Sequence, residues 1–398
     1  MRRIHPIVGT VLVLAGVALI LWFRISPGPS LPFPFSQLSP TWPGESNYWR
    51  DDLRLLGNHA VPPLLTQLKR RSFGELTMVR SLRRNLPPSL AKFVPDVGQA
   101  HYSRAVVLWA LGEIGPAASN ATPDLIHFRD RTSEADERAA ATIALAKIHP
   151  TDMAARSNFL ALLSSSQQTE RFYAAQEFGA VPMASPEDLT PLIKALGDPD
   201  GEVRANAAFS LSRFGRWGEP AVPVLKSLLI DTYRHVPLTA AVALAAISPE
   251  HVPIALPVIT NAVDRKADLS ELVAPTFFRV AGTSAVAAIP WLSSLMPENP
   301  NGNRGGPYWV ALALCQVSPD PPASAIDQVA KLDFLNLASV ATLKHLGSSA
   351  RNAVPKLLEF ERITISPTAR AAIQAALVQI TNSASLRGTN GLPPDPNG

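Results

Sequence analysis

Cysteine is almost absent from this chain of 398 residues, in which Cys315 is the only one. A single thiol excludes an intramolecular disulfide and any zinc motif built on paired cysteines. Its neighbours in the stretch VALALCQV are apolar, and such surroundings are typical of a buried thiol. We therefore predict that Cys315 belongs to the hydrophobic core.

Motifs of the common enzyme classes are absent as well. The chain contains no GxSxG, GxxxxGK[ST] or GxGxxG stretch, and none of its eight histidines forms an HExxH or HxH pair. Each histidine, His251 among them, is interpreted as a helix-end or surface residue. The sequence predicts no catalytic residue, no metal site and no cofactor.

Charged residues are few, at 17% of the chain against 46% hydrophobic residues. The formal net charge is +4, but Arg2, Arg3 and Arg24 supply most of it from a segment without acids. The remaining chain is close to neutral, which argues against a duplex nucleic-acid surface built on phosphate neutralisation. The hydrophobic fraction is enough for a large core, so we expect most of the chain to be ordered.

The amino-terminal segment contains a long hydrophobic run, which is uncharged from Pro6 to Phe23. About 18 residues at roughly 1.5 Å per residue match the hydrocarbon thickness of a bilayer. We predict a transmembrane signal anchor at residues 6–23 after a short cytoplasmic stub at 1–5, with a cleaved signal peptide as the alternative. The positive-inside rule then places the N-terminus in the cytoplasm and the repeat domain outside it.

Prolines follow the hydrophobic run closely. Six lie between residues 24 and 46, where their spacing forbids a helix and favours extended polyproline structure. We predict a semi-rigid linker at 24–46 that holds the folded part away from the membrane.

A helical stripe begins in the stretch DGEVRANAAFSLSRFG, residues 200–215. After Arg204, apolar residues follow at the third, fourth, seventh and tenth positions, which is the spacing of one helix face. The same stripe follows Arg171, Arg138 and Arg104 at steps of 33 or 34 residues, and it continues without a regular arginine towards residue 380. Each copy therefore predicts a helix, with small residues in the middle of its apolar face.

Proline marks a second position in most copies. It lies about 19 or 20 residues after the start of the stripe, just before another apolar run. Proline is tolerated in the first turn of a helix, where its missing N–H has no intrahelical partner. Between the two helices, Gly115, Gly215 and Gly347 stand where a helix would end in a left-handed residue. The prolines that predict the start of a second helix are Pro123, Pro191, Pro223, Pro257, Pro290 and Pro355.

A unit of about 33 residues with two helices cannot bury its own apolar faces, so neighbouring units must stack. The unit DPDGEVRANAAFSLSRFGRWGEPAVPVLKSLL resembles HEAT and HEAT-like repeats in its acidic turn, Val-Arg, paired alanines and Ala-Val-Pro-x-Leu. The resemblance implies an all-α chain, a right-handed α-solenoid of about nine helix pairs. We expect the solenoid at residues 47–382, with an insertion at 71–99, a disordered tail at 383–398 and almost no strand.

The arginines that lead four successive copies have two possible roles. They could form a line of positive charge that binds an acidic partner. Alternatively, each pairs with an acid of its own or an adjacent turn, such as Asp136, Glu170 or Asp200, and fixes the stacking of repeats. The residues are Arg104, Arg138, Arg171 and Arg204.

The strongest basic cluster lies in and beside the predicted insertion, and Glu75 is the one acid in the sequence between its first and last members. Near the membrane anchor it could contact anionic lipid headgroups or an acidic partner, or it could be a plain solvated face. Trp217 is a further candidate, either as a contact residue or as a packing residue between repeats. The members of the basic cluster are Lys69, Arg70, Arg71, Arg80, Arg83, Arg84 and Lys92.

The resemblance implies a partner-binding surface more than any single activity. We predict a membrane-anchored HEAT-repeat scaffold that presents a solenoid surface to a protein or peptide partner, without catalysis of its own and without nucleic acid. Two alternatives stay open. One is an enzyme-like member of the family, since some relatives attach or isomerise bilins and others excise damaged DNA bases. The other is binding of anionic lipid through the basic segment 69–92.

Overall fold

The computed structural model describes residues 53–54, 57–69, 98–266, 270–296, 308–331, 337–364 and 367–382. Every regular element in these ranges is a helix, and none of them contains a strand. The prediction of an all-α chain is therefore confirmed for the described residues. They form two compact units, of which the first ends at Ala184 and the second begins at Ser185.

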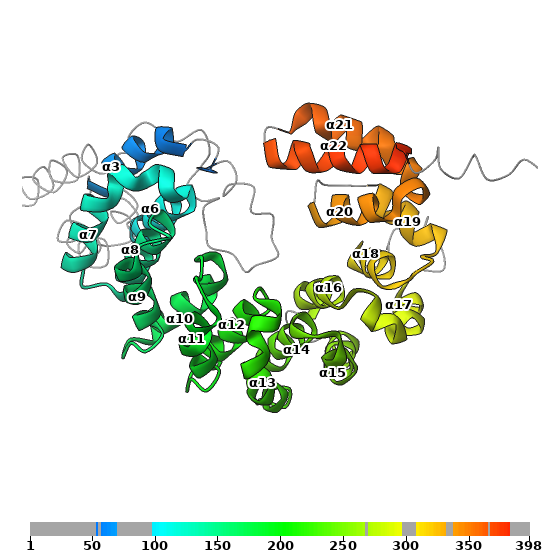
Figure 1. Cartoon of the computed structure of the whole chain (residues 1–398), viewed down its shortest axis with the longest axis horizontal. Coiled ribbons are helices and arrows are strands. Elements are labelled where there is room, and N and C mark those ends of the chain that lie inside the picture. Colours follow the sequence, from blue (N-terminus) through cyan, green and yellow to red (C-terminus); the bar gives the residue numbers. More distant parts are fainter. Residues whose placement is uncertain are drawn as a thin grey trace, which may run out of the picture. The chain divides into compact units, whose positions relative to one another are not determined.

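The first unit is built around three helices that pack side by side. Helix α8 contacts α6 and α10 on its two sides, while α7 and α9 pack against it as the second helices of their repeats (Figure 1). An earlier helix, α3, contacts α6. The elements are η2 (Gly57–Ala60), α3 (Val61–Lys69), α6 (Gly98–Ile114), η3 (Gly115–Ala121), α7 (Thr122–Arg131), α8 (Ala135–Ile148), α9 (Met153–Leu162), α10 (Gln168–Glu177) and η4 (Phe178–Ala180).

The second unit repeats this arrangement over a longer stretch. Its first helices form a row in which α12, α14, α16, α18, α20 and α22 each contact the next. Second helices such as α13, α15 and α17 lie on one side of that row (Figure 1). The elements are η5 (Pro186–Leu189), α11 (Thr190–Ala195), α12 (Gly201–Leu211), η6 (Gly215–Ala221), α13 (Val222–Leu228), α14 (Val236–Ile247), η7 (Pro249–His251), α15 (Val252–Asp264), α16 (Ser270–Ala281), η8 (Gly282–Ala288), α17 (Ile289–Leu295), α18 (Tyr308–Val317), α19 (Ala323–Ala330), α20 (Leu337–Leu346), η9 (Gly347–Ala353), α21 (Val354–Ile363) and α22 (Pro367–Asn382).

The predicted stripe is the core of both units. Ala207, Ala208 and Leu211 of α12 are fully buried, as are the equivalent residues of α14. Burial extends beyond the stripe, because a first helix has neighbours on three sides: eleven of the fourteen residues of α8 are buried. The first helices therefore supply most of the core, and the second helices cover one side of it.

A short 3₁₀ segment joins the two helices of most repeats. Gly115 and Gly215 open two of these segments with φ values of +70° and +52°, in the left-handed region that favours glycine. The segments η3, η6, η8 and η9 each run for seven residues, end in alanine and lead directly into the second helix. Gly115 and Gly215 were predicted from the sequence as helix-end residues, whereas the 3₁₀ segments were not.

The prolines begin second helices in five of the six predicted places. Pro123, Pro191, Pro223, Pro290 and Pro355 occupy the first turn of α7, α11, α13, α17 and α21. Pro257 is a correction, because it lies inside α15 and Pro253 takes the first-turn position. The physical reason is the connection before α15. The 3₁₀ segment η7 has only three residues there, so the helix begins earlier in the repeat.

The predicted membrane location is corrected by the structure. No helix among the described residues is both long and apolar enough to cross a bilayer. The longest of these helices is α6, with 17 residues, against about 20 apolar residues needed to span the hydrocarbon core. The segment predicted as the anchor, residues 6–23, lies outside the described residues, as do the stub at 1–5, the linker at 24–46 and the tail at 383–398. The predicted insertion at 71–99 does so as well, except that α6 already begins at Gly98.

Close approach of first helices depends on small residues at the contact. A Cβ atom added at Gly112 of α6 would lie 2.9 Å from Cα of Ala144 in α8. That atom belongs to the backbone of a buried helix, so it cannot swing aside as a flexible side chain would. Gly112 therefore sets the distance between the two helices.

The substitution Gly112→Ala should lower the free energy of unfolding by about 1–2 kcal/mol, because overpacking outweighs the gain of about 1 kcal/mol in helix propensity. Urea unfolding followed by circular dichroism measures the change. Gly197→Ala is the matched control, since its Cβ would meet no atom closer than 3.6 Å. A stabilised Gly112→Ala protein would show that the α6–α8 distance is not limited by this contact.

Candidate functional site

The repeated arginines reach from one repeat to an acid of the next. Arg204 binds both carboxylate oxygens of Asp231, with Nε 3.0 Å from Oδ2 and Nη2 2.9 Å from Oδ1. Arg138 forms an ion pair with Glu170. The Nη1 atom of Arg104 lies 3.8 Å from Oε1 of Glu137. Each of these three pairs joins successive repeats within one unit.

The same arginines also bind the turn that precedes their own helix. Arg171 donates to the carbonyl oxygen of Ser165 at 2.9 Å, and Arg204 donates to that of Asp198 at 2.7 Å. Arg370 of α22 repeats the contact with Thr364 at 2.8 Å, again six residues earlier. A guanidinium group has five hydrogen-bond donors, so one arginine can bind the turn before its own helix and an acid of the following repeat at once. Arg138 and Arg204 make both contacts.

Asp200 has a different role from pairing with Arg204. Its Oδ1 accepts hydrogen bonds from the backbone N–H groups of Glu202 at 2.9 Å and Val203 at 3.2 Å, which caps α12. Asp136 lies inside the first turn of α8 and accepts from the backbone N–H of Glu137, so it is not a cap of the same kind. Both acids lie at the start of a first helix, where a negative charge is favourable.

Asp231 has a perturbed pKa as a result of its pairing. Burial alone would raise the pKa of this carboxyl group, but hydrogen bonds from Arg204 and from the backbone N–H of Tyr233 outweigh burial and lower it. The folded state therefore favours the charged form of Asp231 more than the unfolded chain does.

A buried ion network in the first unit was not predicted. The ammonium group of Lys147 in α8 lies 2.6 Å from Oε1 of Glu113 in α6 and 2.7 Å from Oε2 of Glu177 in α10. Arg54 adds a second cation, 3.1 Å from the other oxygen of Glu113. Two carboxylates are thus balanced by two cations. Glu113, Lys147 and Glu177 lie at the ends of three neighbouring first helices, and Arg54 comes from the residues before α3. Of the three buried members, Glu113 and Lys147 share one register position, nine residues after Arg104 and Arg138, which was a usable signal.

The predicted basic cluster cannot be placed as a group. Lys69 is the last residue of α3, and the other six members lie outside the described residues. Trp217 lies in η6 with 40% of its surface exposed, so it is available for contact with a partner. Cys315 is buried in α18, as its apolar neighbours predicted. Burial raises the pKa of its thiol to about 12.

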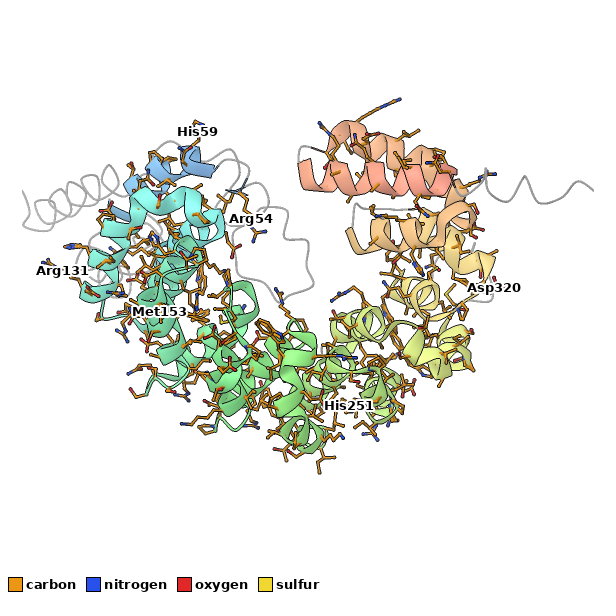
Figure 2. The ribbon with its side chains drawn as sticks, viewed as in Figure 1. Arg54, His59, Arg131, Met153, His251 and Asp320 are labelled. Carbon is orange, nitrogen blue, oxygen red and sulfur yellow. The ribbon has the colours of Figure 1, made fainter. Side chains whose placement is uncertain are left out.

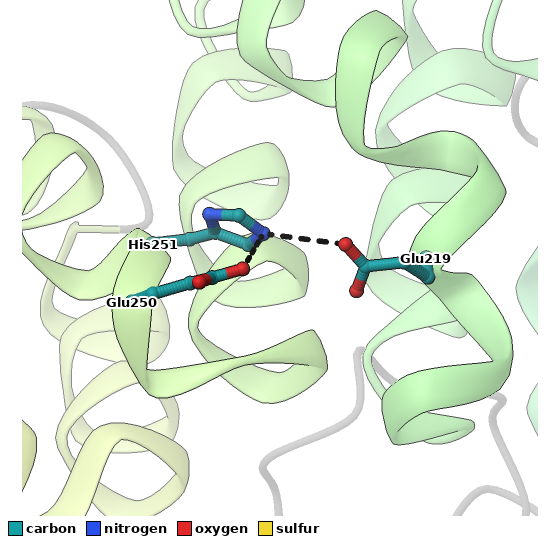
Figure 3. A group of neighbouring side chains, drawn as sticks. All are labelled: Glu219, Glu250 and His251. Carbon is teal, nitrogen blue, oxygen red and sulfur yellow. Dashed lines mark ion pairs between the residues drawn. The ribbon is translucent and has the colours of Figure 1, made fainter.

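The start of two successive second helices brings Glu219, Glu250 and His251 together. Glu219 belongs to η6, before α13, and the other two belong to η7, before α15. The Nε2 atom of His251 lies 3.6 Å from Oε1 of Glu250 and 3.9 Å from Oε1 of Glu219 (Figure 3). His251 lies at a helix end as predicted, but it is 6% exposed and sits inside the packed part of its unit (Figure 2). Sequence reasoning missed this cluster, because Glu219 is 32 residues from His251 and no motif joins them.

The substitution Asp231→Asn should lower the free energy of unfolding by about 1–2 kcal/mol at pH 7, since it removes a charge that accepts hydrogen bonds from Arg204. Because the pKa of Asp231 is lowered in the folded state, this stabilisation is present above the unfolded value near pH 4 and is lost as pH falls through the folded pKa. The difference between wild type and variant should therefore shrink below about pH 4. Urea unfolding at a series of pH values measures it.

Asp130→Asn is the control for Asp231→Asn, because Asp130 also pairs with a neighbouring arginine, Arg129, but its side chain is exposed. Its unfolding midpoint should equal that of the wild type at pH 7. Equal midpoints for the wild type and Asp231→Asn would contradict a stabilising role of the Arg204–Asp231 pair.

Comparison with known proteins identifies the repeat. Two overlapping stretches, residues 157–245 and 189–271, match the family model described as HEAT repeats. No curated protein matches the sequence significantly.

Among solved structures, the chain is similar to an engineered protein of the Northeast Structural Genomics Consortium, with 17% identity, a TM-score of 0.35, and coverage of 87% of this chain and 98% of that one. It is also similar to a multiple mutant of Kap121p, with 14% identity, a TM-score of 0.31, and coverage of 93% of this chain and 45% of that one. Likenesses this low add nothing on function, and the family match identifies residues 157–271 as HEAT repeats.

Proposed function

We propose that this HEAT-repeat protein is a non-catalytic scaffold that binds a protein or peptide partner through the exposed faces of its second helices. The observation that supports it is the difference between the two helices of a repeat. First helices such as α8 and α14 are buried almost all round, whereas the second helices keep a solvent face. The fold thus leaves the second helices available for contact.

Apolar side chains on those solvent faces are the expected contact points. Val224 of α13 is 38% exposed and Ile254 of α15 is 44% exposed. Trp217, in the segment before α13, is 40% exposed. Burying an aliphatic side chain of this size fully contributes about 1.5–3 kcal/mol, so a few such residues can anchor a partner. The α13–α15 surface, defined by these three residues, is therefore the proposed binding surface.

The buried charges of the first unit support a scaffold rather than an enzyme. An enzyme-like relative would use a buried carboxylate beside basic groups to act on its substrate. Glu113 and Glu177 are buried beside a basic group, but both are engaged by Lys147 within hydrogen-bonding distance. Their geometry serves the packing of α6, α8 and α10.

The double variant Val224→Asp/Ile254→Asp of the full chain should lose partners that the wild type retains. Each protein is immobilised, incubated with extract of the source cells, and its bound proteins are quantified by mass spectrometry. A bound protein that falls at least tenfold with the double variant is then purified, and its affinity for the wild type and the variants is measured directly. Two charges in an apolar interface account for such a loss, because their desolvation is uncompensated.

Ile126→Asp is the matched control, since Ile126 is an exposed apolar residue of α7 in the first unit, at 40%. It should retain the partner if the contact is specific to the α13–α15 surface. Circular dichroism must show equal helix content for all variants. A purified partner that binds the double variant as tightly as the wild type would contradict the proposed surface.

A further inference from the structure

We propose that Glu219, Glu250 and His251 form a site for a divalent transition-metal ion, with Zn²⁺ as the best match. The three side chains each offer one ligand atom, and these atoms all lie within 4.8 Å of one another. In a tetrahedral zinc site, ligand atoms at about 2.0–2.2 Å from the ion lie about 3.4 Å apart. Two of the three separations, 3.6 Å and 3.9 Å, are already close to this value.

The buried imidazole is the observation that points to a ligand. The side chain of His251 is 7% exposed, and its Nε2 atom has no hydrogen-bond partner among the residues that the structure describes. This atom faces both carboxylates in Figure 3. A buried imidazole nitrogen without a hydrogen-bond partner is costly, and coordination of a metal ion satisfies it.

The two glutamates supply charge and adaptability. Their side chains are 55% and 69% exposed, so they can rotate by the small amount that closes the remaining distance. Two carboxylates carry a charge of −2, which exceeds the partial positive charge of about +0.5 at each of the two helix starts nearby. The field at the cluster therefore favours a cation.

The ligand types select the kind of ion. One imidazole nitrogen with two carboxylate oxygens suits Zn²⁺, whereas Mg²⁺ and Ca²⁺ prefer oxygen ligands alone. Three protein ligands leave at least one coordination position open, on the exposed side of the carboxylates. Because Glu219 belongs to η6 and the other two residues to η7, the bound ion would link two successive repeats.

Isothermal titration of the full chain with ZnCl₂, after treatment with a chelator and its removal, tests the site. The wild type should bind Zn²⁺ at least tenfold more tightly than the double variant Glu219→Gln/Glu250→Gln. These isosteric changes affect exposed side chains, so the fold should persist, and circular dichroism checks it. The melting temperature should rise with Zn²⁺ for the wild type and not for the double variant.

Glu202→Gln is the matched control, because Glu202 stands 3.6 Å from a second buried histidine, His235. Among the described residues, this pair is not part of a group of three potential ligands. Tyr233 also donates a hydrogen bond to Glu202, which occupies that carboxylate. This variant should bind Zn²⁺ as the wild type does. Equal affinity and equal thermal shift in all three proteins would place zinc elsewhere on the chain and overturn the proposal.

Two further outcomes would also overturn it. Absence of Zn²⁺ binding by the wild type would mean that the glutamates serve only as polar neighbours of His251. Equal affinity of the wild type for Mg²⁺ and Zn²⁺ would indicate a general acidic surface without coordination by the imidazole.

Discussion

The close approach of neighbouring first helices is the contact on which each unit depends. A helix pair of about 33 residues has an apolar stripe on its first helix that its own second helix covers only in part. The stripe is buried completely only when the next first helix lies against it, as α8 does against α6. Small residues make this possible: Gly112 meets Ala144 at a distance that leaves no room for a further methyl group. Stacking is therefore decided by the small residues, and the larger apolar residues fill the space around them.

Periodicity made the helices and their core predictable, because burial follows the stripe. Ala240, Ala241 and Leu244 of α14 were placed on the buried face without an arginine to mark them, and all three are fully buried. The connections were less predictable. Seven-residue 3₁₀ segments leave no periodic apolar pattern, and the shorter η7 moved the start of α15 so that Pro257 fell inside the helix. Local loop length, which the stripe does not report, decides which proline begins a helix.

Contacts between charged groups were predictable only where the register holds. Arg138 and Glu170 occupy regular positions, and their pairing was among the alternatives that the sequence suggested. Glu177 is the last residue of α10 and stands six residues after Arg171. Glu113 and Lys147 instead stand nine residues after Arg104 and Arg138. The network of these three residues therefore could not be predicted from the sequence. The same holds for His251 and Glu219, which are brought together by two connections of different length.

All of these cross-repeat contacts join neighbours in sequence. Arg204 and Asp231 are 27 residues apart, and Lys147 is 34 residues from Glu113 and 30 from Glu177. A repeat that touches only its neighbours contributes to stability through its own helices and the two boundaries it shares. The charged pairs lie at these boundaries, where water is partly excluded and an unmatched charge would cost more than at the open surface. Changes at one boundary should therefore weaken that boundary without altering distant ones, so a repeat can acquire a surface residue such as Trp217 or a cluster such as Glu219, Glu250 and His251 while the rest of the stack stays the same.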